Sequence, residues 1–441
     1  MLIYILTFIV IFFIVIFISL FCLFKKNLIV DNAYLIIPAI CIGLWALYSH
    51  LIQDPDNIFT WDVDVVYVAG KKALTDPANI YDVPTFQYMP NFTIFIAIIL
   101  SIFPYSLAYP ILFLYNYLWA ILAIREFNKI LILKEVSKKI HRFMFLMIFS
   151  NGFWVYFQFY LVQTKFFVLL ILLYIIRREL QFNIEQKEKD LKYYLINFNL
   201  LILAAGTAPQ CILYLLLYIF QDVRYNEIFK KENFKKYIIA AGFFLIQNIF
   251  FIIFPHQIFE FLARFQHMSE EKRIRMSLIY LREWVDISKR LSIILNILSL
   301  IALFIIIAFL IYKNHLEIQE KFGWLSLAFI LIGFWFHQSA PAIIFFSLIL
   351  LLFVPHLNQD VKGFEFIKSN RILLTGILSI LIISFLAYEY GFVMVLFIPR
   401  PKELILVLLL DLRWIIFFSI MIISLILIKL NLEKVNNNLI G

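Results

Sequence analysis

Long apolar runs separated by short polar segments recur along the whole chain. A run of roughly 18–20 apolar residues is long enough to cross the hydrocarbon core of a membrane as a helix. The pattern therefore predicts an all-α polytopic membrane protein with about twelve transmembrane helices. The predicted single or paired spans are 1–24, 34–52, 91–104, 106–124, 143–176, 194–220, 237–254, 291–312, 323–337, 341–354, 371–388 and 404–428.

The first run is interpreted as a transmembrane helix and not as a signal peptide. It starts at Met1 without a basic leader, and no small-residue cleavage site follows it. Together with the later runs, it predicts a single integral membrane domain over residues 1–441.

Three of the predicted elements are irregular. Segment 91–104 is too short to cross a membrane upright at about 1.5 Å per residue, which predicts a short or re-entrant helix. Segment 143–176 is expected to form a hairpin of two short helices with its polar turn at 162–165. The apolar stretch 194–220 is interrupted at 204–210, which contains Pro209. Because proline cannot donate in a helix ladder, this predicts a broken helix.

Charge along the chain predicts the topology. The 38 Lys and Arg residues against 29 Asp and Glu residues give a net charge of +9, and basic residues collect in cytoplasmic loops. The loop 53–90 reverses this balance, with six aspartates against two lysines. We therefore expect 53–90 to be extracytoplasmic. The span 237–254 is expected to run outward, so the long polar stretch 255–290 that follows it is expected to be extracytoplasmic as well. The basic segment 125–142 and the one that begins at Arg177 are expected inside.

Composition excludes several classes of protein. Hydrophobic residues make up 63% of the chain and charged residues 15%, against roughly 25% charged in soluble domains, so an ordinary soluble enzyme is excluded. The positive charge is explained by topology, and no nucleic-acid partner is expected. Cys22, Cys41 and Cys211 lie in apolar runs without metal-ligand spacing, which excludes a disulfide framework or a zinc site.

The most informative polar segment lies in the loop 53–90. Asp62 and Asp64 open a helix-like stretch, and Ile80-Tyr81-Asp82 and Tyr88-Met89-Pro90 follow. This order resembles the first extracytoplasmic loop of GT-C glycosyltransferases. The resemblance is closest to glycosyltransferase family 87, the polyprenol-phosphate-mannose-dependent mannosyltransferases, whose loop reads roughly Asp-Phe-x-Val-Tyr-Tyr-x-Ala…Tyr…Tyr-Pro-Pro. Asp62 falls seven residues before Ala69, as that pattern requires.

Later segments resemble the same family in the same order. Gln163 lies where the family has Gly-Gln, and the interruption at 204–210 lies where it has an apolar run ending in Lys-Pro. Residues 335–338, Trp-Phe-His-Gln, resemble the family's Trp-x-His-His. The chain departs from the family pattern at Met89, Val162, Ala208 and Gln338. The pair Asp62-x-Asp64 also resembles the acidic pair of the first mannosyltransferase of GPI-anchor synthesis, a related GT-C enzyme.

The resemblance implies a GT-C-type fold and transfer of a sugar from a polyprenyl-phosphate carrier. Such transfer needs a carboxylate to take the proton of the acceptor hydroxyl and cations to stabilise the departing phosphate. Asp62 is the candidate base, and His337 is the candidate contact to the carrier phosphate or the leaving oxygen. The candidate substrate-binding residues are Asp64, Lys71, Lys72, Tyr88, Gln163, Lys165, Arg264, Arg275, Arg282 and Gln338.

The relative direction of the Asp62 and Asp64 side chains depends on whether the backbone is helical or extended. On a helix, two positions apart, Asp64 points away from Asp62, whereas in an extended segment both would share a face and could hold a metal. We assign no metal and no cofactor beyond the polyprenyl-phosphate sugar that serves as donor.

The sequence thus predicts an inverting hexosyltransferase, with mannose as the favoured sugar, acting on the extracytoplasmic face of a cell membrane. Its partners would be membrane lipids, the lipid-linked donor, and a glycan or glycolipid acceptor. The alternatives are a polytopic transporter or lipid-linked-glycan flippase, and a related GT-C enzyme that uses a glucose or arabinose donor. A transporter would place its site near the bilayer midplane, whereas the polar residues here cluster toward one face. The sugar, the acceptor and the oligomeric state stay open.

Overall fold

The computed structural model describes the backbone of residues 43–44, 61–83, 86, 88–136, 158–159, 164–208, 211–224, 231–270, 294, 298, 301–302, 304–310, 316–332, 347–348 and 351. At 61–62, 219–224, 231–233, 264–270 and 327–332 it describes the backbone alone. Apart from 134–136, these residues belong to one compact unit, formed by Val30–Leu133 and Trp154–Leu352. The structure below is that of this unit.

All regular structure in the described residues is helical, as predicted. The helices are α3 (Trp61–Thr75), η2 (Pro77–Asp82), α4 (Pro90–Phe92), η3 (Thr93–Ala97), α5 (Ile98–Ile102), α6 (Tyr105–Leu133), α9 (Lys165–Ile184), α10 (Leu191–Ala205), α11 (Ile212–Arg224), α12 (Lys231–Gln247), α13 (Ile249–Ile253), α14 (His256–Glu270) and α17 (Ile318–Ile332). Among them α6, with 29 residues, is the one helix long and apolar enough to cross a membrane by itself. The number of spans stays a prediction.

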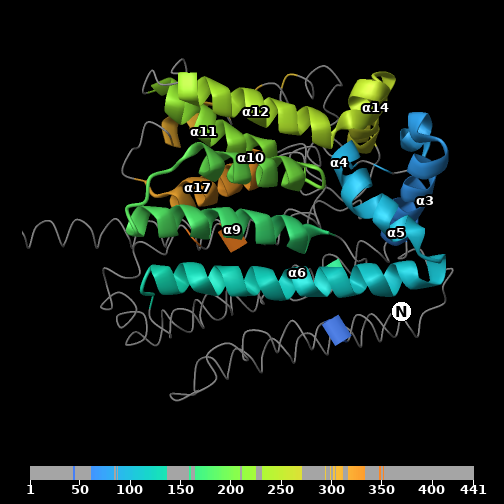
Figure 1. The fold of residues 1–441 in the computed structure, drawn as a ribbon, viewed down its shortest axis with the longest axis horizontal. Helices are drawn as coiled ribbons and strands as arrows, with labels where there is room; N and C mark the ends of the chain where they lie inside the picture. The colour runs from blue at the N-terminus through green and yellow to red at the C-terminus, as the bar shows by residue number, and fades with distance from the viewer. Residues whose placement is uncertain are drawn as a thin grey trace, which may run out of the picture. The chain divides into compact units, whose positions relative to one another are not determined.

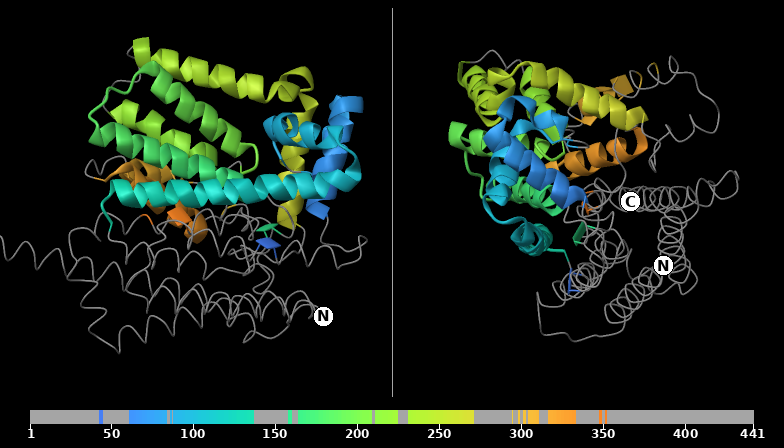
Figure 2. Two further views of the ribbon diagram at one scale, coloured as in Figure 1. Left: turned by 60° about the horizontal axis from the view of Figure 1, so that its bottom comes forward. Right: turned by 90° about the vertical axis from the view of Figure 1, so that its right-hand side faces the viewer.

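Four of the described helices form a bundle, and two others lie across one of its ends. Helices α6, α9, α10 and α12 run along a common direction, and α3 and α14 stand roughly crosswise at one end (Figures 1 and 2). Aromatic rings join the neighbours: Trp119 of α6 packs on Phe167 of α9 at 5.0 Å, and Phe198 of α10 stacks on Tyr237 of α12 at 5.8 Å. We call the end with α3 and α14 the α3 end.

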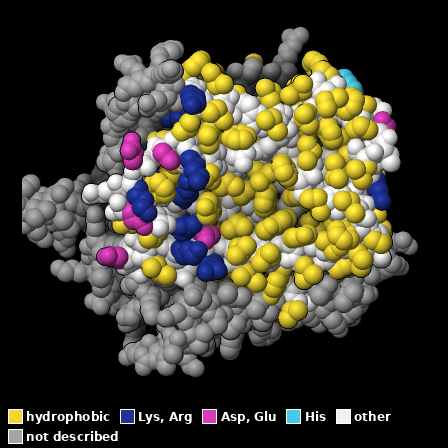
Figure 3. Space-filling view, viewed as in Figure 1, with side chains coloured by type: hydrophobic (Ala, Val, Ile, Leu, Met, Phe, Trp, Pro, Cys, Tyr) yellow, Lys and Arg dark blue, Asp and Glu magenta, His cyan; other side chains and the backbone are white. Residues whose placement is uncertain are grey.

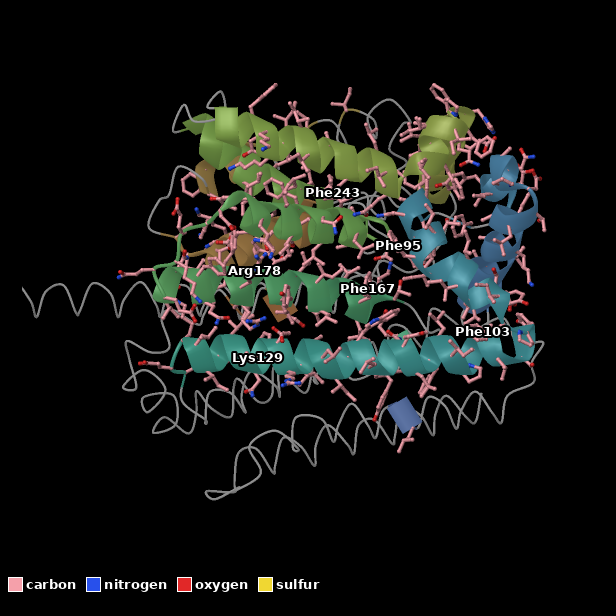
Figure 4. The ribbon with its side chains drawn as sticks, viewed as in Figure 1. Phe95, Phe103, Lys129, Phe167, Arg178 and Phe243 are labelled. Atoms are coloured by element: carbon pink, nitrogen blue, oxygen red, sulfur yellow. The ribbon has the colours of Figure 1, made fainter. Side chains whose placement is uncertain are left out.

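The opposite end of the bundle carries the charged side chains. Hydrophobic side chains cover the middle and the α3 end of the face seen in Figure 3, while Lys, Arg, Asp and Glu gather toward the other end. Lys129 of α6 and Arg178 of α9 mark that end in Figure 4, and Phe103 marks the α3 end. We call the end with Lys129, Arg177, Arg178 and Lys189 the basic end.

The short helix predicted at 91–104 is confirmed, since one continuous apolar helical segment runs over Pro90–Ile102. Its middle, η3, is a turn of π-helix, a feature that appears mostly as single turns inside α-helices and often at functional sites. Helix α3 packs directly on this turn. A Cβ added at Gly70 of α3 would lie 2.0 Å from the carbonyl oxygen of Ala97, so the two backbones touch where only glycine fits.

The broken helix predicted over 194–220 is also confirmed, because α10 ends at Ala205 and α11 begins at Ile212. A second break was not predicted. Within the predicted span 237–254, α12 ends at Gln247, and α13 restarts after Asn248, whose backbone is not helical.

Several predicted boundaries were wrong. Helix α6 continues nine residues past 124, into the segment predicted to be a loop, and α9 contains Arg177 and Arg178 within its length. The charges do not end these helices because they pair with each other: Lys129 binds Glu126 at 2.6 Å, and Arg177 also binds Glu126. The predicted loop 255–290 starts with a helix, α14, and α17 begins at Ile318, before the span predicted at 323.

The predicted spans 1–24, 371–388 and 404–428 lie outside the described residues. Most of the predicted spans 34–52, 143–176 and 341–354 do so as well.

Gly70→Ala should destabilise the protein by about 1–3 kcal/mol, because the added methyl group forces apart two packed backbones. Thermal unfolding of the detergent-purified protein measures this as a lower midpoint.

Gly242→Ala is the matched control. A Cβ at Gly242, inside α12, would meet nothing within 4 Å, so the gain in helix propensity should leave stability unchanged or raise it by roughly 0.5–1 kcal/mol. Equal unfolding midpoints for the two variants would contradict the described packing of α3.

Candidate functional site

Helix breaks and helix ends gather at the α3 end. Among the helices at this end, α4, α9 and α11 begin there and α10 and α12 end there, although they come from distant parts of the chain (Figure 1). The first residues are Pro90 of α4, Lys165 of α9 and Ile212 of α11, and the last are Ala205 of α10 and Gln247 of α12. Helix ends leave backbone N–H and C=O groups without partners inside the helix. Where several helix ends meet, these groups need hydrogen bonds from other parts of the protein.

Asn91 lies among these helix ends and forms hydrogen bonds with several of them. It is fully buried, and its amide nitrogen donates to the carbonyl of Ile202, at 2.9 Å, and to Oε1 of Gln247, at 3.2 Å. Its Oδ1 accepts the backbone N–H of Phe92 at 2.9 Å, and its own N–H donates to Oδ1 of Asn248 at 3.4 Å. One side chain thus connects the start of α4 to α10 and to the break after α12.

The amide network extends along α12 to α10. Gln247 Nε2 donates to the carbonyl and the side-chain oxygen of Asn199, and Asn248 donates to the carbonyl of Phe244 at 3.0 Å. We call Asn91, Asn199, Gln247 and Asn248 the amide cluster. Gly206 lies against it, since a Cβ there would be 2.3 Å from Oδ1 of Asn91. The turn after α10 therefore needs glycine at this point.

Lys165 and Tyr88 meet beside the same turn. The Lys165 side chain is only 9% exposed, and its ammonium donates to the carbonyl of Thr207 at 3.1 Å. The same ammonium lies 5.5 Å from the centre of the Tyr88 ring, a cation–π distance. Met89, next to Tyr88, donates its N–H to the carbonyl of Gly206 at 3.0 Å. Two of the candidate residues, separated widely in sequence, are thus brought together.

Tyr81 connects this region to α14. Its hydroxyl donates to the carbonyl of Tyr88 at 2.9 Å. Burial raises the pKa of Tyr81 well above its ordinary value, and the negative charge of Glu260 on α14 raises it further. The hydroxyl therefore stays protonated and keeps donating. Helix α14 is also held against η2, because His256 Nε2 lies 2.8 Å from the carbonyl oxygen of Ala78.

Helix α3 is fixed at its start by α6. Asp64 accepts a hydrogen bond from the hydroxyl of Tyr105, and the Tyr67 hydroxyl donates to the carbonyl of Phe103 at 3.1 Å. Position 62 lies in the first turn of α3, and its helical register is that of Val66 and Ala69, which are both buried. Asp62 and Asp64 therefore start from different faces of the helix.

The other candidate residues are distributed as follows. Lys72 forms an ion pair with Asp82 at 2.9 Å, and Lys71 is exposed, 5.7 Å from the centre of the Tyr67 ring. The structure describes the backbone but not the side chains of Asp62 and Arg264. Outside the described residues lie Gln163, Arg275, Arg282, His337 and Gln338. Within the described part of the chain, no three His, Cys, Asp or Glu side chains are grouped as metal ligands.

Sequence reasoning missed the amide cluster. None of its four residues is among the predicted catalytic or substrate-binding residues. The signal that could have found the cluster is the adjacent pair Gln247-Asn248 inside an apolar run, since a polar group there needs a partner.

No family model, curated protein or solved structure matches the chain.

Asn91→Ala should destabilise the protein by about 1–3 kcal/mol or more, because it leaves the buried groups of Ile202 and Gln247 without their donor. The unfolding midpoint measures the loss.

Asn79→Ala is the control. The Asn79 amide donates to the Asp76 carboxylate at 3.1 Å in a half-buried turn outside the amide cluster, so its loss should cost no more than about 0.5 kcal/mol. If the Asn91→Ala protein were as stable as this control, the central role of Asn91 in satisfying the helix ends would be contradicted.

Proposed function

We propose that this chain is a multi-span membrane glycosyltransferase of the GT-C type. It moves a hexose, with mannose as the favoured sugar, from a polyprenyl-phosphate carrier to a lipid-linked or glycan acceptor. Transfer takes place on the extracytoplasmic face and inverts the configuration at the anomeric carbon.

One observation carries the proposal: α3, with Asp62 in its first turn, lies across the bundle end where helix breaks, the amide cluster and the buried Lys165 ammonium gather. In a membrane, irregular backbone is tolerated where it is buried in protein or lines a wet cavity. Ionisable residues at such depth are a sign of a functional site. The α3 end brings together a buried ammonium, buried amides and irregular backbone, although its surface in Figure 3 is mostly apolar.

The distribution of charge supports the orientation. The basic end carries Lys129, Arg177, Arg178 and Lys189, and basic residues favour the cytoplasmic side. The α3 end then faces outward, where polyprenyl-phosphate sugars would reach it laterally from the bilayer. This orientation agrees with the excess of aspartate over lysine in the loop 53–90.

The chemistry assigned to the site is simple. Asp62 removes the proton of the acceptor hydroxyl as the hydroxyl oxygen attacks the anomeric carbon of the donor sugar. The bond between that carbon and the phosphate oxygen breaks, and the phosphate leaves with the electron pair. Lys165, whose ammonium is already buried at the α3 end, stabilises the developing charge. His337 is assigned to the same phosphate, and Tyr88 positions the lysine.

The test uses the full-length protein in liposomes, with radiolabelled polyprenyl-phosphate mannose and a native lipid extract. Asp62→Asn should lower transfer by about 10²–10⁴-fold, because the amide cannot accept the proton, while the unfolding midpoint stays within a few degrees of wild type.

The control is Asp76→Asn in the same loop. The Asp76 carboxylate accepts hydrogen bonds from Asn79 on its own turn, and its replacement should leave the rate within about twofold. Retained transfer by Asp62→Asn would refute the assignment of the base. Absence of transfer by the folded wild-type protein, together with movement of the lipid-linked sugar between leaflets, would favour a flippase.

A further inference from the structure

Helix α9 begins with a threonine whose side chain does not cap it. Thr164 occupies the N-cap position, and its hydroxyl makes no cap hydrogen bond. The residue is only 2% exposed, and within the described part of the chain its Oγ1 has no hydrogen-bond partner at all. A threonine at this position ordinarily accepts an N–H of the first turn. Here the buried hydroxyl lies at the start of a 20-residue helix, where backbone N–H groups have no partner within the helix itself.

The charge at this point is positive. The N-terminus of a helix carries a partial positive charge from the aligned peptide dipoles, and Lys165, the first residue of α9, adds its buried ammonium. The starts of two further helices lie close by. Pro90 follows Met89, which bonds the carbonyl of Gly206, and Ile212 begins α11 on the other side of the same turn.

Carbonyl groups at and just after the end of α10 would oppose this field, but protein donors bind three of them. Asn91 takes the carbonyl of Ile202, Met89 takes that of Gly206, and Lys165 takes that of Thr207. What the surroundings of Thr164 offer a ligand is therefore a hydroxyl, helix N–H groups and an ammonium. A tetrahedral oxyanion can use all of them at once, and helix N-termini commonly bind phosphate in this way.

We propose that the N-terminus of α9, with Thr164 Oγ1 and Lys165 Nζ, binds the phosphate group of a polyprenyl-phosphate carrier. This assignment rests on the proposed function and names the place where the leaving group is held. Tyr88, stacked on Phe92 at 4.1 Å and facing the Lys165 ammonium, keeps the lysine in position.

The test measures binding, not transfer. Farnesyl phosphate serves as the probe and is titrated into the full-length protein in nanodiscs. Lys165→Met should weaken its binding by about 10-fold to 100-fold, and Thr164→Val by about threefold to tenfold, as expected for loss of a charged and of a neutral hydrogen-bonding partner. Farnesol, which lacks the phosphate, should bind wild type and both variants equally.

Matched controls come from the same protein. Lys187→Met removes an exposed lysine in the turn between α9 and α10, and Thr75→Val removes an exposed threonine at the end of α3. Both should bind farnesyl phosphate as wild type does. Wild-type affinity in both Thr164→Val and Lys165→Met would overturn the proposal. If inorganic phosphate binds as tightly as farnesyl phosphate, the site binds free phosphate, and the proposal that it binds a polyprenyl-phosphate carrier is overturned.

A second measurement covers variants that fail to fold. A diazirine-bearing farnesyl phosphate is cross-linked to wild-type protein and the labelled peptides are mapped. Labels on peptides containing residues 88–92, 164–168 or 206–212 support the site, and labels confined to other peptides overturn it.

The outcome is separable from that of the proposed function. If transfer depends on Asp62 but the α9 variants bind phosphate as wild type does, the proposed function is supported and the phosphate site at α9 is refuted. If phosphate binding depends on Lys165 but no acceptor receives a sugar, the phosphate site is supported and the transferase function is refuted.

Discussion

The structure depends on how buried backbone groups are satisfied where helices break. In a chain that is 63% hydrophobic, such groups find few partners, and an unmade hydrogen bond in an apolar interior is costly. Asn91 meets this constraint by bonding α10 and both residues of the Gln247-Asn248 pair. The closeness of Gly206 to its side chain shows that these breaks fit together as one unit.

The position of α3 follows from that arrangement. The π-helical turn of the segment that starts at Pro90 packs against Gly70. At the corner before α6, the carbonyl of Phe103 accepts a hydrogen bond from Tyr67, and the hydroxyl of Tyr105 donates to Asp64. The loop that carries Asp62 is therefore packed on rigid elements over most of its described length. Rigid support of this kind is what a catalytic group needs, because small displacements of a reacting group cost much of its effect.

The two ends of the bundle use charge differently. At the basic end, charged groups neutralise one another: Glu179 is buried and accepts from Lys189 at 2.6 Å and from the Tyr218 hydroxyl at 2.9 Å. Buried pairs of this kind hold helices in register without offering a ligand anything. At the α3 end, the Lys165 ammonium is held by a carbonyl and a ring, with a buried hydroxyl beside it. The proposed phosphate site lies at this second end.

For the residues that the structure describes, the sequence by itself determined that the regular structure is helical and where two segments are irregular, because apolar patterning, segment length and proline act locally. It indicated the short helix after Pro90 and the break at 204–210, but it left open whether Asp62 and Asp64 share a face, which helix α3 decided. It did not determine where α6 and α9 end, since Glu126 of α6 pairs both with Lys129 of the same helix and with Arg177 of α9. Nor could it reveal the amide cluster or the meeting of Lys165 with Tyr88. Asn91 and Ile202 are 111 residues apart, and only the packing of the helices decides which distant polar groups share one buried space.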